Sequence, residues 1–438
     1  MKTIVAKFGG SSLADAAQIR KAAAIVLADP DRRFVVASAP GKRGSGDTKV
    51  TDLLYQCYEA AAAGADFEPA LEKIRQRFRQ ILTDLEISFP LEAQLEIIRT
   101  HLKTAPQRDY MASRGEFLNA QILASYLGWR FLDTAPLVRF FPDGRLDDEM
   151  TQKLLSAALN ETERAVLPGF YGAEEDGTIR TFSRGGSDIT GSLAAAAADA
   201  AIYENWTDVS GMLFTDPRIV PSPKTISYIT YRELRELSYM GASVMHEDAV
   251  FPVRKAGIPI NIRNTNRPED SGTMIVRELP ESVEVQNITG IAGKTGFTSI
   301  SVAKSMMNGE VGFGAKLLSI FASHGISFEH CPTGIDTMSV IVGTAHFEQE
   351  REAVLEEIRR ELQPELMRVE ENLALIVVVG RGMVNAMGSA AKIFGALAAD
   401  GINVRMVDQG SSEMSVIIGV SDADFENAIR SIYASCTN

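Results

Sequence analysis

Two glycine-rich turns, far apart in the sequence, carry charged side chains suited to group transfer. The first reads KFGGSS from Lys7 onward, and the second reads SRGGSD and contains Arg184 and Asp188. Backbone N–H groups in a Gly-Gly turn can converge on an anion, and the dipole of a following helix adds to the attraction. Together the turns predict a phosphate site that faces a site for a small charged substrate.

Lys7 places a positive charge at the mouth of the first turn, beside Gly9 and Gly10. Phosphoryl transfer depends on charge neutralisation and positioning more than on covalent chemistry, so this combination suits it. An ordinary loop at the start of a helix explains the same residues roughly half the time. The chain has no GxxxxGK[ST], HRD or DFG motif, which disfavours a P-loop NTPase and a protein kinase.

The second turn combines Arg184 with Asp188. An arginine can clamp a carboxylate, and an aspartate can hold an ammonium group or a metal. A tight turn in which Ser187 or Asp188 caps the following helix has roughly even odds on the motif alone. Glu116, after Gly115, stands at the head of another helical pattern, where N-terminal capping explains it equally well.

Polar residues after a predicted strand indicate where a second part of a nucleotide would lie. Thr207 and Asp208 end the strand predicted over 201–206, and Asp216 and Arg218 follow a turn. Ligands of open α/β sheets bind at the carboxyl ends of the strands. Asp216 precedes a proline and is also an ordinary turn former, so the ligand interpretation and the turn interpretation both stay open.

Strand and helix patterns alternate around these turns. Residues 3–8 and 33–38 are predicted strands, and residues 14–28 between them have helical spacing. Strand, glycine turn, helix and strand begin a parallel α/β sheet. Further strands are predicted at 166–170, 178–182, 201–206 and 259–263, with a hairpin turn at Asp176-Gly177 and an alanine-rich helix over 191–203.

A long helix is predicted around Leu71, Ile74, Phe78, Ile81 and Leu85, which keep one face apolar. Its charged residues are most simply assigned to a solvated face, namely Arg75, Arg77, Arg79 and Asp84.

The last third of the chain contains an internal repeat. Ala315-Lys316 recurs as Ala391-Lys392, and MSVI recurs from Met338 to Met414, with equal offsets (391 − 315 = 76; 414 − 338 = 76). The order of helix, turn and strands in each copy suits a βαββαβ ferredoxin-like unit. Prolines and glycines up to Pro280 indicate that the first domain ends near residue 285.

The composition of the chain counts against several kinds of binding partner and site. The net charge of −13 counts against nucleic acid and anionic membranes. Cys57, Cys331 and Cys436 form no metal-ligand pattern and are predicted to be reduced thiols in a cytoplasmic protein. We expect no signal peptide, because only six residues precede Lys7, and no membrane span, because no apolar run approaches the ~18 residues that one requires.

In this order the motifs resemble those of aspartate kinases, in the amino-acid kinase superfamily. They are KFGGSS, SAPGK with KVTDLL, SRGE, SRGGSD, NWTDVSG, FTDPR and GASVMH, followed by two copies similar to ACT domains. The duplicated tail separates aspartate kinases from glutamate, carbamate and nucleotide kinases. The resemblance implies an αβα sandwich with a mainly parallel sheet over 1–285 and ferredoxin-like ACT domains over 286–368 and 369–438.

The resemblance also implies transfer of the γ-phosphate of Mg-ATP to the β-carboxylate of L-aspartate, which gives β-aspartyl phosphate. A carboxylate is already ionised at pH 7, so no general base is required. The obstacle is repulsion between two anions, which a lysine and Mg²⁺ reduce. We expect ATP to carry the Mg²⁺ and assign it no protein ligand.

Site roles follow position by position from the resemblance. Lys7 and Asp188 are the expected catalytic residues. Substrate contacts are expected from Ser38, Thr51, Glu116, Arg184 and Ser187, with Arg184 on the α-carboxylate. Nucleotide contacts are expected from Lys7, Gly9, Gly10, Thr207, Asp208, Leu213, Arg218 and Ser243. Many members of the family have lysine in place of Ser243 and tyrosine in place of Leu213.

The ACT-like pair implies feedback control by a small amino acid, with lysine the first expectation and threonine the second. Met307, Gly312 and Glu329 are candidate effector residues, although a solvated carboxylate at a strand end explains Glu329 about as well. Such domains usually pair between chains, so we expect a homodimer or a dimer of dimers. Two alternatives stay open, a glutamate kinase and a catalytically inactive amino-acid sensor.

Overall fold

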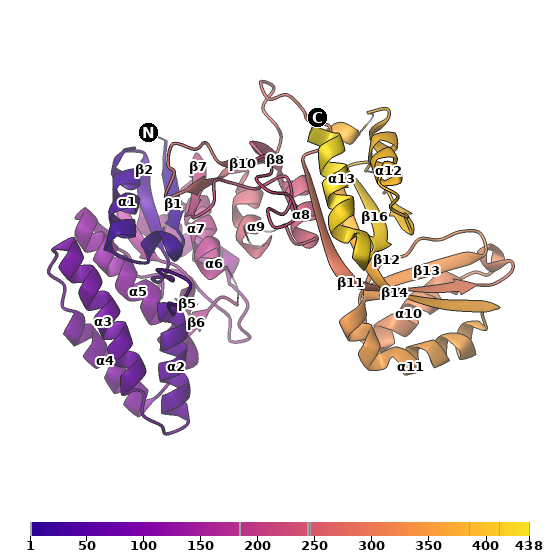
Figure 1. Ribbon diagram of the computed structural model, residues 1–438. Helices are drawn as coiled ribbons and strands as arrows, with labels where there is room; N and C mark the ends of the chain where they lie inside the picture. Colours follow the sequence, from indigo (N-terminus) through magenta and orange to yellow (C-terminus); the bar gives the residue numbers. More distant parts are fainter. Residues whose placement is uncertain are drawn as a thin grey trace. The chain divides into compact units, whose positions relative to one another are not determined.

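The computed structural model describes residues 2–183, 185–242, 245, 247–384, 386–410 and 412–437. The chain divides into two compact units (Figure 1). The first comprises Met1–Met212, Thr225–Tyr231 and Val244–Leu279, and the second comprises Leu213–Lys224, Arg232–Ser243 and Pro280–Asn438. The domain limits at residues 285 and 368 stay predictions.

A twisted sheet forms the centre of the first unit. Over the described residues it has eight strands in the order β3-β4-β2-β1-β7-β9-β10-β8. Neighbouring strands are parallel except β9 and β10, which confirms the predicted parallel α/β sheet. The strands are β1 (Ile4–Phe8), β2 (Arg32–Ala37), β3 (Arg130–Phe131), β4 (Ala165–Pro168), β7 (Ile202–Thr207), β8 (Tyr228–Thr230), β9 (Ile260–Asn264) and β10 (Thr273–Val276).

Helices cover both faces of this sheet. One group shares a core with alternate side chains of β1 such as Phe8; it comprises α1 (Ala16–Leu27), α2 (Val50–Ala62), α3 (Glu68–Leu85), α4 (Leu91–Thr104) and α5 (Arg108–Leu127). The other face of β1 contacts α7 (Gly186–Ala197), which packs between α6 (Asp148–Asn160) and α9 (Glu247–Ala256). The helix α8 (Tyr231–Tyr239) follows β8.

The alanine-rich helix lies flat on the sheet, but it is shorter than predicted. It ends at Ala197, and β7 begins at Ile202. A Cβ at Gly191 would lie 2.5 Å from the Tyr203 hydroxyl, so Tyr203 belongs to the strand beneath the helix. The predicted hairpin forms between β5 (Tyr171–Ala173) and β6 (Ile179–Thr181).

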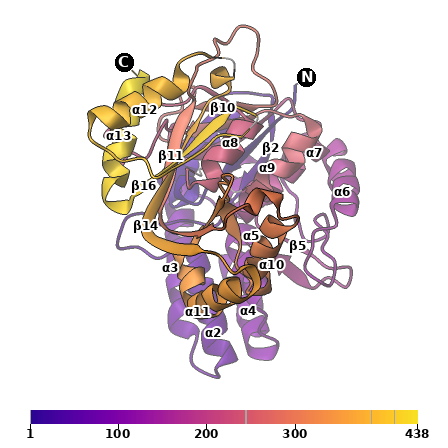
Figure 2. The same cartoon turned by 90° about the vertical axis from the view of Figure 1, so that its right-hand side faces the viewer.

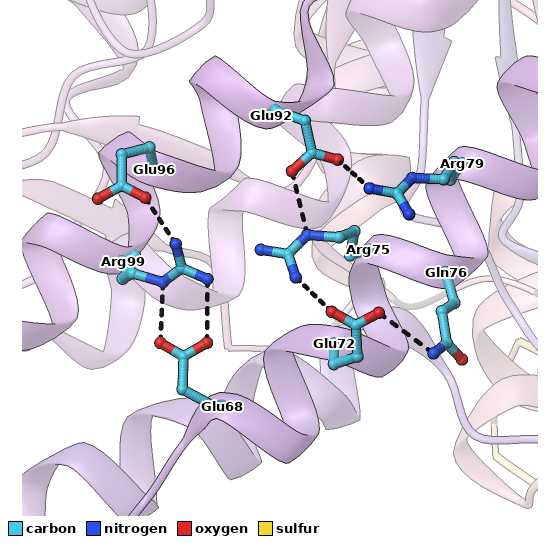
Figure 3. Close-up of polar contacts among 8 residues, drawn as sticks. All are labelled: Glu68, Glu72, Arg75, Gln76, Arg79, Glu92, Glu96 and Arg99. Atoms are coloured by element: carbon cyan, nitrogen blue, oxygen red, sulfur yellow. Dashed lines mark hydrogen bonds and ion pairs between the residues drawn. The ribbon is translucent and has the colours of Figure 1, made fainter.

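Ion pairs align α3 with α4 (Figure 3). Glu92 of α4 accepts hydrogen bonds from Arg75 at 3.1 Å and from Arg79 at 2.6 Å. Exposed pairs of this kind are worth less than about 1 kcal/mol each, so they orient the helices more than they stabilise them. The predicted solvated face holds for Arg79. It is wrong for Arg77, which is only 5% exposed.

The second unit is built on an antiparallel sheet. In the part of the chain that the structure describes, its order is β12-β13-β11-β14-β16-β15, with antiparallel neighbours throughout. The strands are β11 (Gly290–Ala303), β12 (Phe328–His330), β13 (Thr337–Gly343), β14 (Leu366–Val379), β15 (Met406–Asp408) and β16 (Ser415–Ser421).

The helices of this unit confirm the internal repeat. The helices α10 (Phe313–Ser323) and α12 (Ser389–Ala399) begin and end the same distance apart (389 − 313 = 76; 399 − 323 = 76). The first copy is completed by α11 (Thr344–Leu362) and the second by α13 (Phe425–Thr437). Each copy has a hydrophobic core of its own.

The two copies share their longest strands, β11 and β14, which run through the whole second unit (Figure 2). The amino-terminal part of β11, from Gly290 to Lys294, pairs with the carboxyl-terminal part of β14. The second ferredoxin-like sheet is therefore completed by a strand that precedes the first copy in sequence. Phe214, Ile219 and Val220 also pack into the core of the second copy.

Within the described ranges, no helix is long and apolar enough to cross a membrane. The three cysteines are free, as predicted.

Candidate active site

A buried ion pair lies at the carboxyl ends of two neighbouring strands. Lys7 of β1 is paired in register with Asn205 of β7, so both side chains face α7. The Lys7 Nζ lies 2.6 Å from Oδ1 of Asp188 and 3.5 Å from Oδ1 of Asn205. Asn205 donates a hydrogen bond of 2.8 Å to the same Asp188 oxygen. Lys7 and Asp188 are the two residues predicted as catalytic, whereas Asn205, in NWTDVSG, had no predicted role.

The residues of this cluster are buried, which strengthens the electrostatic interactions among them. Lys7 is 7% exposed and Asn205 is 3% exposed, and electrostatic interactions are stronger where water is excluded. Asp188 lies in the first turn of α7, where the helix dipole stabilises a carboxylate. The cluster thus holds a fixed ammonium group at the edge of the sheet where ligands bind in open α/β folds.

The first glycine turn makes close contact with a second backbone segment. The Gly41 N–H donates to the Gly10 carbonyl at 2.8 Å, and a Cβ at Gly41 would lie only 2.5 Å from the Gly10 carbonyl carbon. Gly10 itself has an ordinary right-handed conformation, so close approach explains Gly10 and Gly41; a Cβ at Gly9 would meet only ordinary contacts at 3.6 Å. The Gly9 N–H donates to the Trp206 carbonyl at 2.9 Å and is therefore used within the protein, contrary to the expectation that it faces an anion.

The second glycine turn begins α7. Gly185 has φ = 59°, in the left-handed region that favours glycine. Ser187 packs so closely on Gly169 that a Cβ at Gly169 would lie 2.6 Å from the Ser187 Cβ. Arg184, the predicted carboxylate clamp, and Ser243, a predicted nucleotide contact, lie outside the described residues.

Glu116 is buried in the middle of α5, which begins at Arg108, so the capping explanation is wrong. A Cβ at Gly115 would lie 2.7 Å from the Ala39 Cβ, which shows how closely α5 packs on the loop after β2. The Glu116 Oε2 has no hydrogen-bond partner among the described residues. Burial raises the pKa of Glu116 to about 8, although a hydrogen bond from the Ala39 backbone and the charge of Arg114 oppose the rise.

Ser38 and Thr51 flank this loop. Ser38 is buried, and its carbonyl accepts a hydrogen bond of 2.7 Å from the Asn119 side chain. Thr51 lies in the first turn of α2 and is partly exposed. Because α5 carries both Asn119 and Glu116, a single helix contacts the loop and presents the Glu116 oxygen that has no partner among the described residues.

The predicted nucleotide contacts fall into two groups. Thr207 and Asp208 follow Asn205 at the end of β7, and the Thr207 hydroxyl donates to Asp208 at 3.1 Å. Leu213 and Arg218 belong to the second compact unit. Arg218 is exposed and forms an ion pair with Asp216 at 2.6 Å.

The predicted effector residues lie in the first ACT-like copy. Met307 is buried in its core, and Gly312 caps α10 with φ = 86°. Glu329 of β12 accepts a hydrogen bond of 2.5 Å from the hydroxyl of Tyr239. This bond raises the pKa of Tyr239 to about 12. Glu329 is therefore a partly exposed carboxylate with Tyr239 as a partner.

Family models match both parts of the chain. The amino acid kinase family matches residues 2–264, and an ACT domain matches residues 376–435. Aspartokinase 3 of Bacillus subtilis is 39% identical over 98% of this chain and 97% of its own length.

Solved structures of aspartate kinases are similar over the full chain. That of Clostridium acetobutylicum aspartate kinase is 45% identical, with a TM-score of 0.91 and complete coverage of both chains. Escherichia coli aspartokinase III, solved with aspartate and ADP and also with lysine and aspartate, is 27% identical, with TM-scores of 0.75 and 0.73 and complete coverage. The chain therefore belongs to the amino acid kinase family and, within it, to the aspartokinases.

Proposed function

We propose that this chain transfers the γ-phosphoryl group of ATP to the β-carboxylate of L-aspartate, giving β-aspartyl phosphate and ADP. Membership of the aspartokinases supports the reaction. The observation that carries it is the buried Lys7 ammonium, held by Asp188 and Asn205 beside two glycine turns. Such a cation offsets the repulsion between an anionic acceptor and an anionic phosphate.

Lys7 keeps one N–H donor for the transferring group. An ammonium group has three donors, of which Asp188 and Asn205 occupy two, so one donor can reach a phosphoryl oxygen. Asp188 and Asn205 fix the direction of the cation before substrate binds, and this preorganisation lowers the barrier. The acceptor carboxylate attacks phosphorus directly and needs no general base.

Glu116 and Arg184 are proposed to orient the amino acid. The Glu116 Oε2 atom, which has no partner among the described residues, suits the ammonium group of aspartate, because a buried carboxylate requires a partner. Arg184 is proposed to clamp the α-carboxylate. Holding these two groups leaves the β-carboxylate to face the phosphoryl group. Ser38, Thr51 and Ser187 are proposed as further substrate contacts.

Mg-ATP is the proposed form of the nucleotide. Across the described ranges, no group of three His, Cys, Asp or Glu residues is placed to hold a metal ion. The phosphate oxygens of ATP are the proposed Mg²⁺ ligands, because this ion gives up water reluctantly and commonly binds through substrate phosphates. Gly9, Gly10, Thr207, Asp208, Leu213, Arg218 and Ser243 stay proposed nucleotide contacts.

Feedback control is the proposed role of the ACT-like copies. Escherichia coli aspartokinase III has been solved with lysine bound, so lysine is the first proposed effector and threonine the second. The contact between Tyr239 of α8 and Glu329 of β12 supports a link from these copies to α8. A homodimer or dimer of dimers through the ACT-like copies, and a cytoplasmic location, stay predictions.

One assay tests the proposal. ADP release is measured with Mg-ATP and L-aspartate, L-glutamate or no acceptor, and hydroxylamine traps the acyl phosphate. We expect aspartate-dependent hydroxamate. Glutamate-dependent trapping would indicate a glutamate kinase, and no trapping with either acceptor would indicate an inactive sensor. Addition of lysine or threonine should then lower the rate or shift thermal unfolding, and no change with either would remove the proposed regulation.

A further inference from the structure

Arg77 is a buried cation inside an apolar helix face. It lies on α3 between Ile74 and Ile81, next to Phe78, and all three apolar side chains are buried with it. A guanidinium group is costly to bury unless its donors are satisfied. Its contacts therefore indicate what this arginine does.

The guanidinium group binds backbone from two segments: the residue that follows the first glycine turn, and the loop between β2 and α2. Its Nη1 donates to the Ala14 carbonyl at 2.9 Å and to the Gly41 carbonyl at 3.5 Å. Its Nη2 donates to the Thr48 carbonyl at 3.2 Å and to the carboxylate of Asp47. Ala14 directly follows the short helix that closes the KFGGSS turn. Gly41 and Thr48 lie near the two ends of the loop between β2 and α2.

Further hydrogen bonds connect the backbone that Arg77 contacts to residues proposed to line the reaction site. The Gly41 carbonyl accepts from Arg77, and the Gly41 N–H donates to the Gly10 carbonyl at 2.8 Å. At the other end of the loop, the Val50 N–H donates to the Pro40 carbonyl at 3.2 Å, just before Thr51. One side chain therefore sets the spacing between the Gly10 turn and the start of α2.

A second arginine closes the loop on itself. Arg43 binds the Asp47 carboxylate at 2.9 and 3.0 Å. These hydrogen bonds, together with the charge of Arg77, hold the pKa of Asp47 well below its usual range. Arg43 therefore keeps the loop compact, whereas Arg77 fixes where it lies relative to Ala14 and Gly10.

We infer that Arg77 is a positioning residue for phosphoryl transfer: it touches no proposed reactant, and it holds the Gly10 turn and the loop from Ser38 to Thr51 in register. The inference rests on the proposed function. The planar fork of arginine reaches several acceptors on two sides, whereas a lysine ammonium acts as a point charge. Lysine at this position should preserve the charge but should not hold the turn and the loop in place relative to each other.

The test compares Arg77→Lys and Arg77→Met with Arg79→Met. Arg79 is exposed on the same helix and pairs with Glu92 rather than with the loop. Steady-state rates give kcat and the KM for aspartate and for ATP, and amide hydrogen exchange follows residues 41–50. For Arg77→Lys we expect the KM for aspartate to rise about 10-fold and kcat to fall about 10-fold, because small misplacements cost large factors in rate. Arg79→Met should change both by less than about 2-fold.

Separate values of KM and kcat distinguish a loss of positioning from a loss of stability. Partial unfolding lowers the active fraction and leaves KM unchanged. An unchanged KM for aspartate together with unchanged exchange over 41–50 in folded Arg77→Lys would overturn the inference. If neither Arg77 variant folds, Asp47→Asn removes one acceptor and should raise the same KM about 3-fold, and an unaltered KM there would count as refutation. If the wild-type chain phosphorylates no aspartate, the proposed function fails, and hydrogen exchange alone decides whether Arg77 orders the loop.

Discussion

Glu116→Gln should stabilise the substrate-free protein at alkaline pH while it abolishes aspartate binding. Glu116 is buried, one of its oxygens has no partner among the described residues, and burial raises its pKa to about 8. Glutamine has nearly the same shape and cannot ionise. The substitution therefore removes the cost of a buried charge without leaving a cavity.

The magnitude follows from proton linkage. Between the ordinary pKa of glutamate, 4.5, and a folded-state pKa of about 8, the folded chain keeps a proton that the unfolded chain has lost. The free energy of unfolding then falls with rising pH, by about 1.4 kcal/mol per pH unit. From pH 6 to pH 8, the free energy of unfolding of the wild-type protein should fall by about 2 to 3 kcal/mol relative to that of Glu116→Gln.

Tryptophan fluorescence during urea unfolding can measure this difference. The chain has two tryptophans, Trp129 and Trp206, and both lie with Glu116 in the first compact unit. The signal therefore reports on the unit that carries the substitution. Glu59→Gln, an exposed change on α2, serves as the matched control and should show the pH dependence of the wild type.

Equal pH dependence in Glu116→Gln and in the wild type would refute this reasoning, because Glu116 would then be ionised in the folded protein at both pH values. Substrate binding gives an independent check. If the ammonium group of aspartate pairs with Glu116, binding at pH 7 should release about one proton, since the pair favours the carboxylate. Calorimetry in two buffers of different ionisation enthalpy should show this release in the wild type and no binding in Glu116→Gln.

Three further changes test the site and the tail. Lys7→Ala should lower kcat by at least ~10²-fold in the hydroxamate assay, because a transition-state charge is lost; near-normal turnover would remove Lys7 from its role. Gly41→Ala would place a methyl carbon 2.5 Å from backbone of the first turn and should lower both the rate and the unfolding midpoint, whereas Gly44→Ala, in open space, should change neither. His324 contacts two glutamates at 2.9 and 3.2 Å, and the hydrogen bonds to these carboxylates raise its pKa. The contribution of His324 to stability should be complete below about pH 6.5 and should disappear as the pH rises through its raised pKa. An unfolding midpoint of His324→Gln that equals that of the wild type at every pH would contradict this.

The order of strand, glycine turn, helix and strand allowed the parallel sheet to be predicted, because each step is a local pattern. The register between β1 and β7 is not local. It pairs Lys7 with Asn205, which are nearly 200 residues apart, and alternation along a strand indicates only that Asn205 shares a face with Tyr203. The sequence therefore identified Lys7 and Asp188 but not the amide that orients both.

The repeat in the tail was visible because similar residues recur at one spacing. The sharing of strands was not, because polar residues interrupt the sequences of both β11 (GIAGKTGFTSISVA) and β14 (LMRVEENLALIVVV), so neither one reads as a single strand. A run of 14 residues exceeds the usual strand length of about 5 or 6. This length lets each strand pair within both copies.

Arg77 shows why residue type can mislead where periodicity does not. Its position lies three residues after Ile74 and four before Ile81, which is the spacing of the buried stripe of a helix. Periodicity therefore placed position 77 inside, whereas its charge suggested solvent. Because a buried guanidinium group requires acceptors and a helix supplies none on its apolar side, the conflict predicts backbone carbonyls from another segment. Ala14, Gly41 and Thr48 supply those carbonyls. A charged residue at a core position of an amphipathic helix thus indicates a loop that the helix holds in place, and here that loop borders the proposed phosphoryl site.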